Sequence, residues 1–125
     1  MSEYYGKISD LPLDEKNNFI PNSEKRVVFG PNGRFCDDYV VRCFKLHPGS
    51  KSALHKHAWP HVVVCLGGKG VFKIGDEEAL LERGSWAFVP GDMMHIFWNA
   101  SEDSDWEFLC LVPPEGDVNP LLGGC

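Results

Sequence analysis

The chain lacks long hydrophobic runs and has few basic residues. No stretch of its 125 residues approaches the roughly 18 apolar residues that a membrane-spanning helix needs. Residues 1–5 also lack the basic start of a secretory signal. Twelve Lys and Arg against eighteen Asp and Glu give a formal net charge of −6, which disfavours nucleic acids and anionic membranes as partners. We therefore expect a cytoplasmic protein that binds neither.

Cysteine is too sparse and too irregularly spaced to organise the fold. The five cysteines are an odd number without close paired spacing, which argues against a disulfide framework and against a cysteine zinc site. The sequence also lacks a glycine-rich phosphate loop and a serine nucleophile elbow. Its chemistry must therefore come from other side chains. The cysteines are Cys36, Cys43, Cys65, Cys110 and Cys125.

Long helical patterns are absent too, and short apolar runs alternate with turn signals instead. Runs of Val, Phe, Ile and Leu are separated by Gly, Pro, Asn and Asp, a pattern that predicts a single all-β domain. The expected organisation is an N-terminal arm over residues 1–25, a barrel over 26–113 and a C-terminal tail over 114–125. The expected strands cover residues 26–29, 39–46, 52–57, 61–66, 71–74, 79–82, 86–89, 95–99 and 106–112.

Histidine is rare, yet four of the five histidines fall in two places. His55, His57 and His61 lie close together, and His95 follows about forty residues after the first of them. On an extended segment, His55 and His57 project to the same side. Pro60 argues against a helix, on which two zinc-binding histidines would stand four residues apart. Because imidazole is a common metal ligand, the spacing predicts a metal site carried by a strand.

Two groups of residues around these histidines resemble the two sequence motifs of the cupin family. The resemblance covers roughly residues 26 to 113 and implies a double-stranded β-helix, the cupin jelly-roll barrel. It also implies a homodimer, because cupins often pair through sheet edges. The first motif is matched by Gly49, His55, His57, His61 and Gly68, and the second by Gly84, Pro90, His95 and Asn99.

The third ligand position distinguishes this chain from most cupins. Most members carry glutamate where this chain has His61, and the glycine usually found two residues after the second-motif proline is Asp92 here, preceded by Gly91. The pattern His-X-His-X-Trp-X-His resembles that of small manganese cupins with four histidine ligands. The resemblance implies a divalent metal, Mn²⁺ first, with Fe²⁺, Ni²⁺ and Zn²⁺ as alternatives. The implied ligands are His55, His57, His61 and His95.

The substrate pocket is expected to be mostly apolar. Alternation along the strands places Phe97, Phe108 and Cys110 on the same side as the histidines. Trp59 either forms the pocket rim or anchors its turn, and Cys110 either tunes the metal site or only packs. Such a lining favours a small apolar organic substrate over a sugar. The alternative is that these side chains fill a small barrel.

The predicted ligand set leaves several activities open. Four neutral imidazoles leave the ion its full charge, and an octahedral ion would keep two positions for other ligands. We expect a metal-dependent dioxygenase or oxidase, with no catalytic residue assigned. The alternatives are an isomerase, lyase or decarboxylase of a sugar acid or keto acid, and a non-catalytic metal-binding cupin. Chemistry on an acid substrate requires a cation inside the barrel. The candidates Arg42 and Lys45 lie on opposite faces of one strand, so at most one faces inward.

Overall fold

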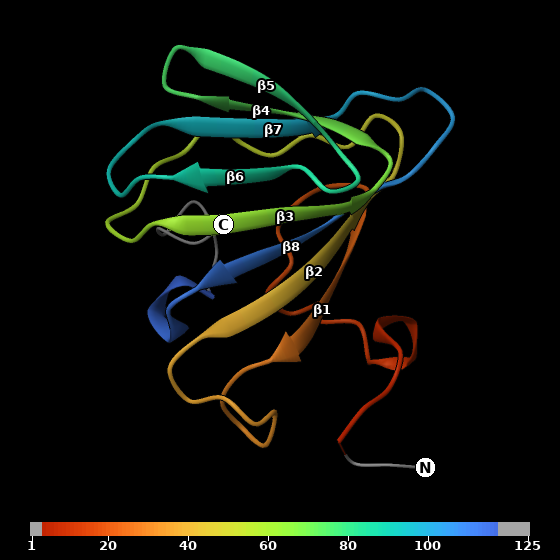
Figure 1. Ribbon diagram of the computed structural model, residues 1–125, viewed down its shortest axis with the longest axis vertical. Helices are drawn as coiled ribbons and strands as arrows, with labels where there is room; N and C mark the ends of the chain where they lie inside the picture. Colours follow the sequence, from red (N-terminus) through yellow and green to blue (C-terminus); the bar gives the residue numbers. More distant parts are fainter. Residues whose placement is uncertain (1–3, 118–125) are drawn as a thin grey trace.

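The computed structural model describes residues 4–117 and confirms the all-β prediction (Figure 1). Its strands form a five-stranded sheet, ordered β1-β2-β8-β3-β6, and a three-stranded sheet, ordered β5-β4-β7, with antiparallel pairing throughout. This is the two-sheet arrangement of a jelly roll. The strands are β1 (Ser23–Phe29), β2 (Val40–Leu46), β3 (His61–Gly67), β4 (Lys69–Ile74), β5 (Glu77–Glu82), β6 (Trp86–Val89), β7 (His95–Asn99) and β8 (Trp106–Val112), and two short 3-10 helices are η1 (Ile8–Asp10) and η2 (Pro114–Gly116).

Eight of the nine expected strands are present, and β6, β7 and β8 have the expected bounds. The strands β1, β4 and β5 begin two or three residues earlier than expected. Their extra residues include Ser23, Lys69 and Glu77, whose backbones pair with Leu46, Glu82 and Ile74. Pairing depends on backbone groups, so these strands continue past the apolar alternation that the sequence displays.

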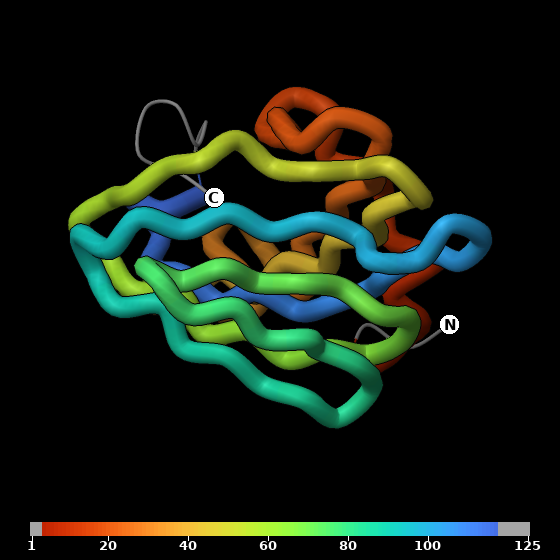
Figure 2. The backbone as a smooth tube through the Cα atoms, turned by 90° about the horizontal axis from the view of Figure 1, so that it is seen from above, coloured from red at the N-terminus to blue at the C-terminus, as the bar shows by residue number. Residues whose placement is uncertain are grey.

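The ninth expected strand, over residues 52–57, is wrong. This segment runs beside β7 (Figure 2) but joins it only through isolated bridges, Lys51 to Trp98 and His55 to His95. Between them the ladder is interrupted, because the backbone N–H of Phe97 donates to the Ser52 hydroxyl at 3.0 Å instead of to a backbone carbonyl. The segment is therefore extended, as the histidine spacing requires, without being a regular strand.

An aromatic cluster fills the space between the two sheets. Its rings lie with centroids 4.5–6.3 Å apart, within the range in which tilted and edge-to-face pairs stabilise a core. Gly70 makes room for the Trp106 indole, which would overlap any Cβ at that position. The cluster consists of Phe44, Phe72, Phe97, Trp106 and Phe108, all buried.

The segments outside the barrel partly cover it. In the N-terminal arm, Ile20 joins the hydrophobic core and Asp14 forms an ion pair with the buried Lys25. The remainder of the tail after Asp117, with Cys125, lies outside the described residues, and its separate role stays a prediction. The four cysteines among residues 4–117 are free thiols. Within this part of the chain, no helix has the length and apolar character to cross a membrane.

Candidate metal centre

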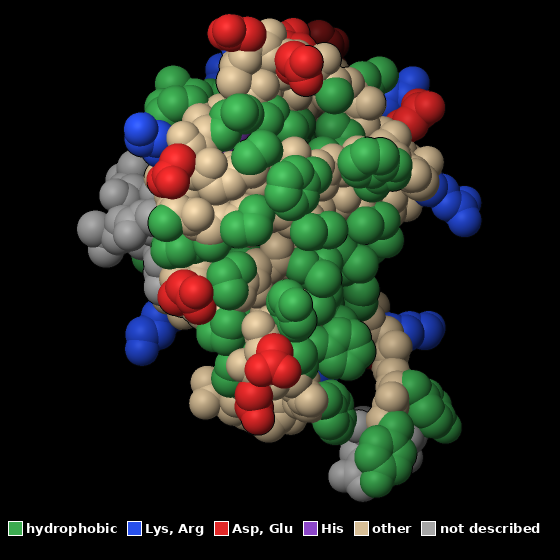
Figure 3. Space-filling model, turned by 60° about the vertical axis from the view of Figure 1, so that its left-hand side comes forward, with side chains coloured by type: hydrophobic (Ala, Val, Ile, Leu, Met, Phe, Trp, Pro, Cys, Tyr) green, Lys and Arg blue, Asp and Glu red, His purple; other side chains and the backbone are tan. Residues whose placement is uncertain are grey.

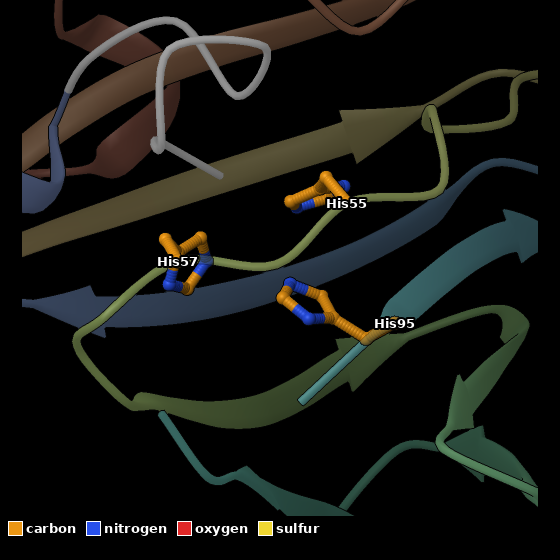
Figure 4. Close-up of side chains that lie close together, drawn as sticks. All are labelled: His55, His57 and His95. Carbon is orange, nitrogen blue, oxygen red and sulfur yellow. The ribbon is translucent and has the colours of Figure 1, made fainter. Parts of the chain in front are cut away.

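Four imidazoles converge at one place in the barrel. His55 and His57 come from the extended segment before β3, His61 begins β3, and His95 begins β7. Figure 4 shows the rings of His55, His57 and His95 turned toward one another, and their ligand nitrogens lie within 4.8 Å of one another. The His61 ring lies 4.2 Å from that of His57, with their Nε2 atoms in contact. All four residues are at most 6% exposed.

Backbone contacts fix the segment that carries the first two histidines. His55 and His95 exchange both backbone hydrogen bonds, at 3.0 and 2.9 Å. The His57 carbonyl accepts from the backbone N–H of Asp92 at 2.6 Å. Asp92 has a φ of 60°, so it adopts the left-handed conformation for which cupins usually have glycine there. Gly91 lies so close to the Ala58 carbonyl that a Cβ would overlap it, which explains the position of this glycine.

Each imidazole is also oriented through its Nδ1 atom. The Nδ1–H groups of His55, His57 and His95 donate to carbonyls two residues away, those of Ala53 at 2.6 Å, Trp59 at 2.8 Å and Met93 at 2.9 Å. The Nδ1 atom of His61 instead lies 3.1 Å from the Cys110 sulfur. With the proton on Nδ1, the Nε2 atoms of His55, His57 and His95 each carry a lone pair. Such outer partners orient histidine ligands in metal sites.

Burial keeps three of these imidazoles neutral. Removal from water, which disfavours the charged form, lowers the pKa of His57 to about 4 and that of His95 to about 3. The same cause lowers the pKa of His55. Neighbouring histidines contribute in the same direction, because a second positive charge nearby is unfavourable. Only the neutral form of imidazole binds a metal ion, so these side chains are ready to act as ligands at neutral pH.

The cluster fits a divalent metal ion. The Nε2 atoms of His55 and His95 are buried without a hydrogen-bond partner, and a buried polar atom of this kind is costly unless something satisfies it. The Nε2 atom of His57, whose Nδ1 atom carries the proton, also meets the Nε2 atom of His61. If His61 also carries its proton on Nδ1, a cation between the two Nε2 atoms would bind both of their lone pairs. Imidazole nitrogen suits Zn, Cu, Fe and Ni.

The predicted pocket residues are near the histidines but differ in role. The Trp59 ring stacks on that of His57, with centroids 4.9 Å apart and an interplanar angle of 8°, and its indole packs against Gly116. Trp59 thus anchors its turn. Phe97, whose ring lies 6.4 Å from that of His55, and Phe108 belong to the aromatic core. Their role as a pocket wall stays a prediction.

The sequence reasoning missed part of the polar interior. Of the two candidate cations, Arg42 faces inward and is fully buried, whereas Lys45 lies on the outer face beside Glu107 at 3.9 Å. Arg42 shares the parity of Phe44 and Leu46 on β2, which is the signal that could have placed it inside. Lys25, also buried, pairs with Asp117 at 2.6 Å. No pattern in the sequence pointed to this pair.

Exposed hydrophobic side chains lie beside the ligands in the sequence. Leu54 precedes His55, and Met93 and Met94 precede His95, all three exposed. Hydrophobic side chains also gather on the face seen in Figure 3. Two cavities, of about 510 and 430 Å³, are lined by other residues, including Arg83 and Ser104 in the first and Asn32 and Arg34 in the second.

Comparison with known proteins identifies the family. The model of the cupin domain matches residues 42–112. A 1-methylthio-D-xylulose 5-phosphate methylsulfurylase from Rhodospirillum rubrum is 31% identical over 97 residues, which are 78% of this chain and 60% of that protein. The chain therefore spans 60% of the length of this curated relative.

Solved structures share the fold at low sequence identity. The polyketide cyclase RemF from Streptomyces resistomycificus has a TM-score of 0.76 at 19% identity, over 87% of this chain and 78% of its own. A cupin-2 domain protein from Rhodospirillum rubrum has a TM-score of 0.71 at 24% identity, over 90% of this chain and 75% of that protein. A predicted oxalate decarboxylase from Thermotoga maritima has a TM-score of 0.72 at 20% identity, over 88% of this chain and 98% of that protein. With its two-sheet barrel and a histidine cluster that fits a metal ion, this chain belongs to the cupin family.

Proposed function

We propose that this cupin is a metal-dependent dioxygenase or oxidase that acts on a small, largely apolar organic substrate. The observation that carries the proposal is the convergence of His55, His57, His61 and His95, with the Nδ1 atoms tied outward and the Nε2 atoms directed inward. An ion bound there supplies Lewis-acid or redox chemistry. We propose Mn²⁺ as this ion, with Fe²⁺, Ni²⁺ and Zn²⁺ as alternatives, because the four-histidine motif resembles that of manganese cupins.

The surroundings of the cluster favour an apolar substrate. The rings that lie beside the ligands are uncharged, because Trp59 adjoins His57 and Phe97 adjoins His55. Trp59 closes one side of His57 by stacking on it. These residues would bind and orient the substrate, while the core aromatics behind His55 exclude water from the far side of the ligands.

The inward cation is not placed to hold a substrate carboxylate. Arg42 lies on the Nδ1 side of His61, where its guanidinium contacts the Cys110 sulfur at 3.0 Å and Asp117 at 3.6 Å. The Nε2 atoms that would face a metal ion and its substrate lie on the opposite edge of the ring. This arrangement argues against an isomerase or decarboxylase that grips an acid through Arg42.

One comparison favours a second candidate. The methylsulfurylase relative is named for chemistry on a phosphorylated sugar thioether, and it is 31% identical over 78% of this chain. A related activity here would require a cation for the phosphate group. Lys56, the basic side chain next to the ligands in the sequence, is exposed and projects to the side opposite His55 and His57 on this extended segment, which counts against this candidate.

Oxygen consumption separates the two candidates. Protein loaded with Mn²⁺ or Fe²⁺ would be mixed with small aromatic, enol and alkene compounds in an oxygen electrode, with the His95→Ala variant as the control. A dioxygenase should place both oxygen atoms in the product, whereas a two-electron oxidase should release hydrogen peroxide. Turnover of a sugar-phosphate thioether without oxygen uptake would favour the second candidate. No oxygen uptake by either loaded form on any compound would contradict the proposed activity.

A further inference from the structure

One of the four histidines is oriented by side chains and not by its own backbone. His55, His57 and His95 each donate from Nδ1 to a carbonyl two residues away. These bonds arise from local chain geometry. The partner of His61 is the Cys110 sulfur, 49 residues away in the sequence, at 3.1 Å. The orientation of this one imidazole therefore depends on the packing of another strand.

The sulfur of Cys110 is itself held by Arg42. The two residues lie directly opposite each other on β8 and β2, both fully buried, and Nη2 of Arg42 lies 3.0 Å from the sulfur. A guanidinium group only donates hydrogen bonds, so the sulfur accepts on this side. A nearby positive charge also favours electron density on the sulfur, which makes it a better acceptor for a second N–H group.

Neutral His61 has two possible forms beside this sulfur. In one form Nδ1–H donates to the sulfur and the Nε2 lone pair points into the cluster. In the other form the sulfur donates to Nδ1, and the proton on Nε2 blocks a metal ion. We propose that Arg42 and Cys110 are positioning residues that hold His61 in the first form. The inference rests on the proposed metal site, because only there does the inward lone pair matter.

Further contacts hold Arg42 in place. Its Nη1 lies 3.6 Å from Asp117, which also pairs with the buried Lys25 at 2.6 Å. Its guanidinium carbon lies 5.2 Å from the centre of the Phe44 ring, a distance at which a cation and an aromatic face attract each other. The guanidinium is thus restrained on several sides while it reaches the sulfur.

Nitrogen NMR of the metal-free full-length protein tests the inference directly. In the wild type, the proton of His61 should reside on Nδ1. In Cys110→Ala this proton should leave Nδ1, while the signals of the other three histidines stay unchanged. Cys110→Ser, whose oxygen can accept both bonds, should retain the wild-type form. The matched control is Cys65→Ala, which removes another buried sulfur that accepts from a ring nitrogen, Nε1 of Trp106 at 3.3 Å.

Metal affinity gives the second readout. In competition with a chelator for Mn²⁺, Cys110→Ala should bind roughly 10- to 100-fold more weakly than the wild type, as for other outer partners of metal ligands. The Cys65→Ala control should bind as the wild type does. In a His61→Ala background, Cys110→Ala should lose most of its effect, because the sulfur acts through His61. Arg42→Met should shift the His61 proton as Cys110→Ala does.

The outcomes distinguish this inference from the proposed function. Failure of the wild type to bind any divalent ion would contradict the metal site itself, whereas the NMR result on metal-free protein concerns His61 alone. The inference is overturned if His61 of the wild type carries its proton on Nε2, or if Cys110→Ala leaves it on Nδ1. It is equally overturned if Cys65→Ala weakens Mn²⁺ binding as much as Cys110→Ala. Should Arg42→Met not fold, the Cys110 variants still decide.

Discussion

His55 and His95 form an antiparallel bridge, in which each backbone N–H donates to the carbonyl of the other and the two rings lie 4.2 Å apart. The bridge joins the segment with the first cupin motif to the strand with the second. Residues directly opposite each other in such a pair place their side chains on the same face. One backbone contact thus unites ligands that are forty residues apart in the sequence.

Removal of either bridged imidazole should abolish tight metal binding with limited damage to the fold. We expect His55→Ala and His95→Ala to retain the far-UV spectrum of the wild type, because the backbone bridge does not require the rings. Each variant should lose at least about tenfold in Mn²⁺ affinity, since it lacks one of four ligands. Isothermal titration measures the loss, and His47→Ala, outside the cluster, is the control. Equal affinities for wild type and both variants would contradict this ligand set.

The pH dependence of stability should reflect the buried neutral histidines. Burial lowers the pKa of His57 to about 4 and that of His95 to about 3, from 6.5. At a pH between the pKa of the folded protein and 6.5, the unfolded chain binds protons that the folded chain does not. The stabilisation is therefore full above pH 6.5 and is lost as the pH falls. Each group contributes at most about 1.4 kcal/mol per pH unit.

Urea unfolding of the metal-free protein between pH 7 and 4.5 measures this dependence. His95→Gln removes one of the titrating groups, so its unfolding free energy should decline less steeply with acid than that of the wild type. Parallel curves for the two proteins would show that His95 is not kept neutral by the fold.

The turn after His57 should be sensitive to a single methyl group at Gly91. In Gly91→Ala the new Cβ overlaps the Ala58 carbonyl, and relief of the overlap must move the backbone between His57 and His61. We expect a loss of about 1–3 kcal/mol in the free energy of unfolding, together with weaker metal binding. Gly67→Ala, where a Cβ meets nothing within 4 Å, is the control and should change stability by about 0.5 kcal/mol or less.

The core aromatics should matter for stability more than for metal binding. Phe108 is fully buried among Phe44, Phe72, Phe97 and Trp106. Its replacement by Ala leaves a cavity, which typically costs about 3–5 kcal/mol. Thermal and urea unfolding of Phe108→Ala measure this cost. A loss under about 1 kcal/mol would indicate that Phe108 lines an open pocket and not a packed core.

The sequence predicts the local part of this site better than its long-range part. Patterns within a few residues are enough to predict the alternation of His55 and His57 and the turn at Pro60. They also predict the strands that begin with His61 and His95. The interruption of the expected strand at 52–57 depends on the hydroxyl of Ser52, which replaces a backbone acceptor. Strand propensities do not indicate where a side-chain hydroxyl takes the place of a backbone carbonyl as hydrogen-bond acceptor.

Contacts between strands that are distant in the sequence are harder to predict from the sequence. The pairing of Arg42 with Cys110 requires the β2–β8 register, and a single sequence does not contain that register. Parity alone allowed Arg42 to face inward but did not reveal that its guanidinium lies behind His61 and away from the ligand nitrogens. The pair of buried Lys25 and Asp117 joins β1 to the C-terminal end of the described residues. Only the fold brings these residues together.

Titration of the chelator-treated protein with Mn²⁺, followed by electron paramagnetic resonance of the free ion, tests the central claim most directly. The proposed site predicts one bound ion per chain, and the loss of that ion in His55→Ala and His95→Ala. A wild-type protein that leaves all of the Mn²⁺ free, or variants that bind as the wild type does, would contradict the assignment of the four histidines as a metal centre.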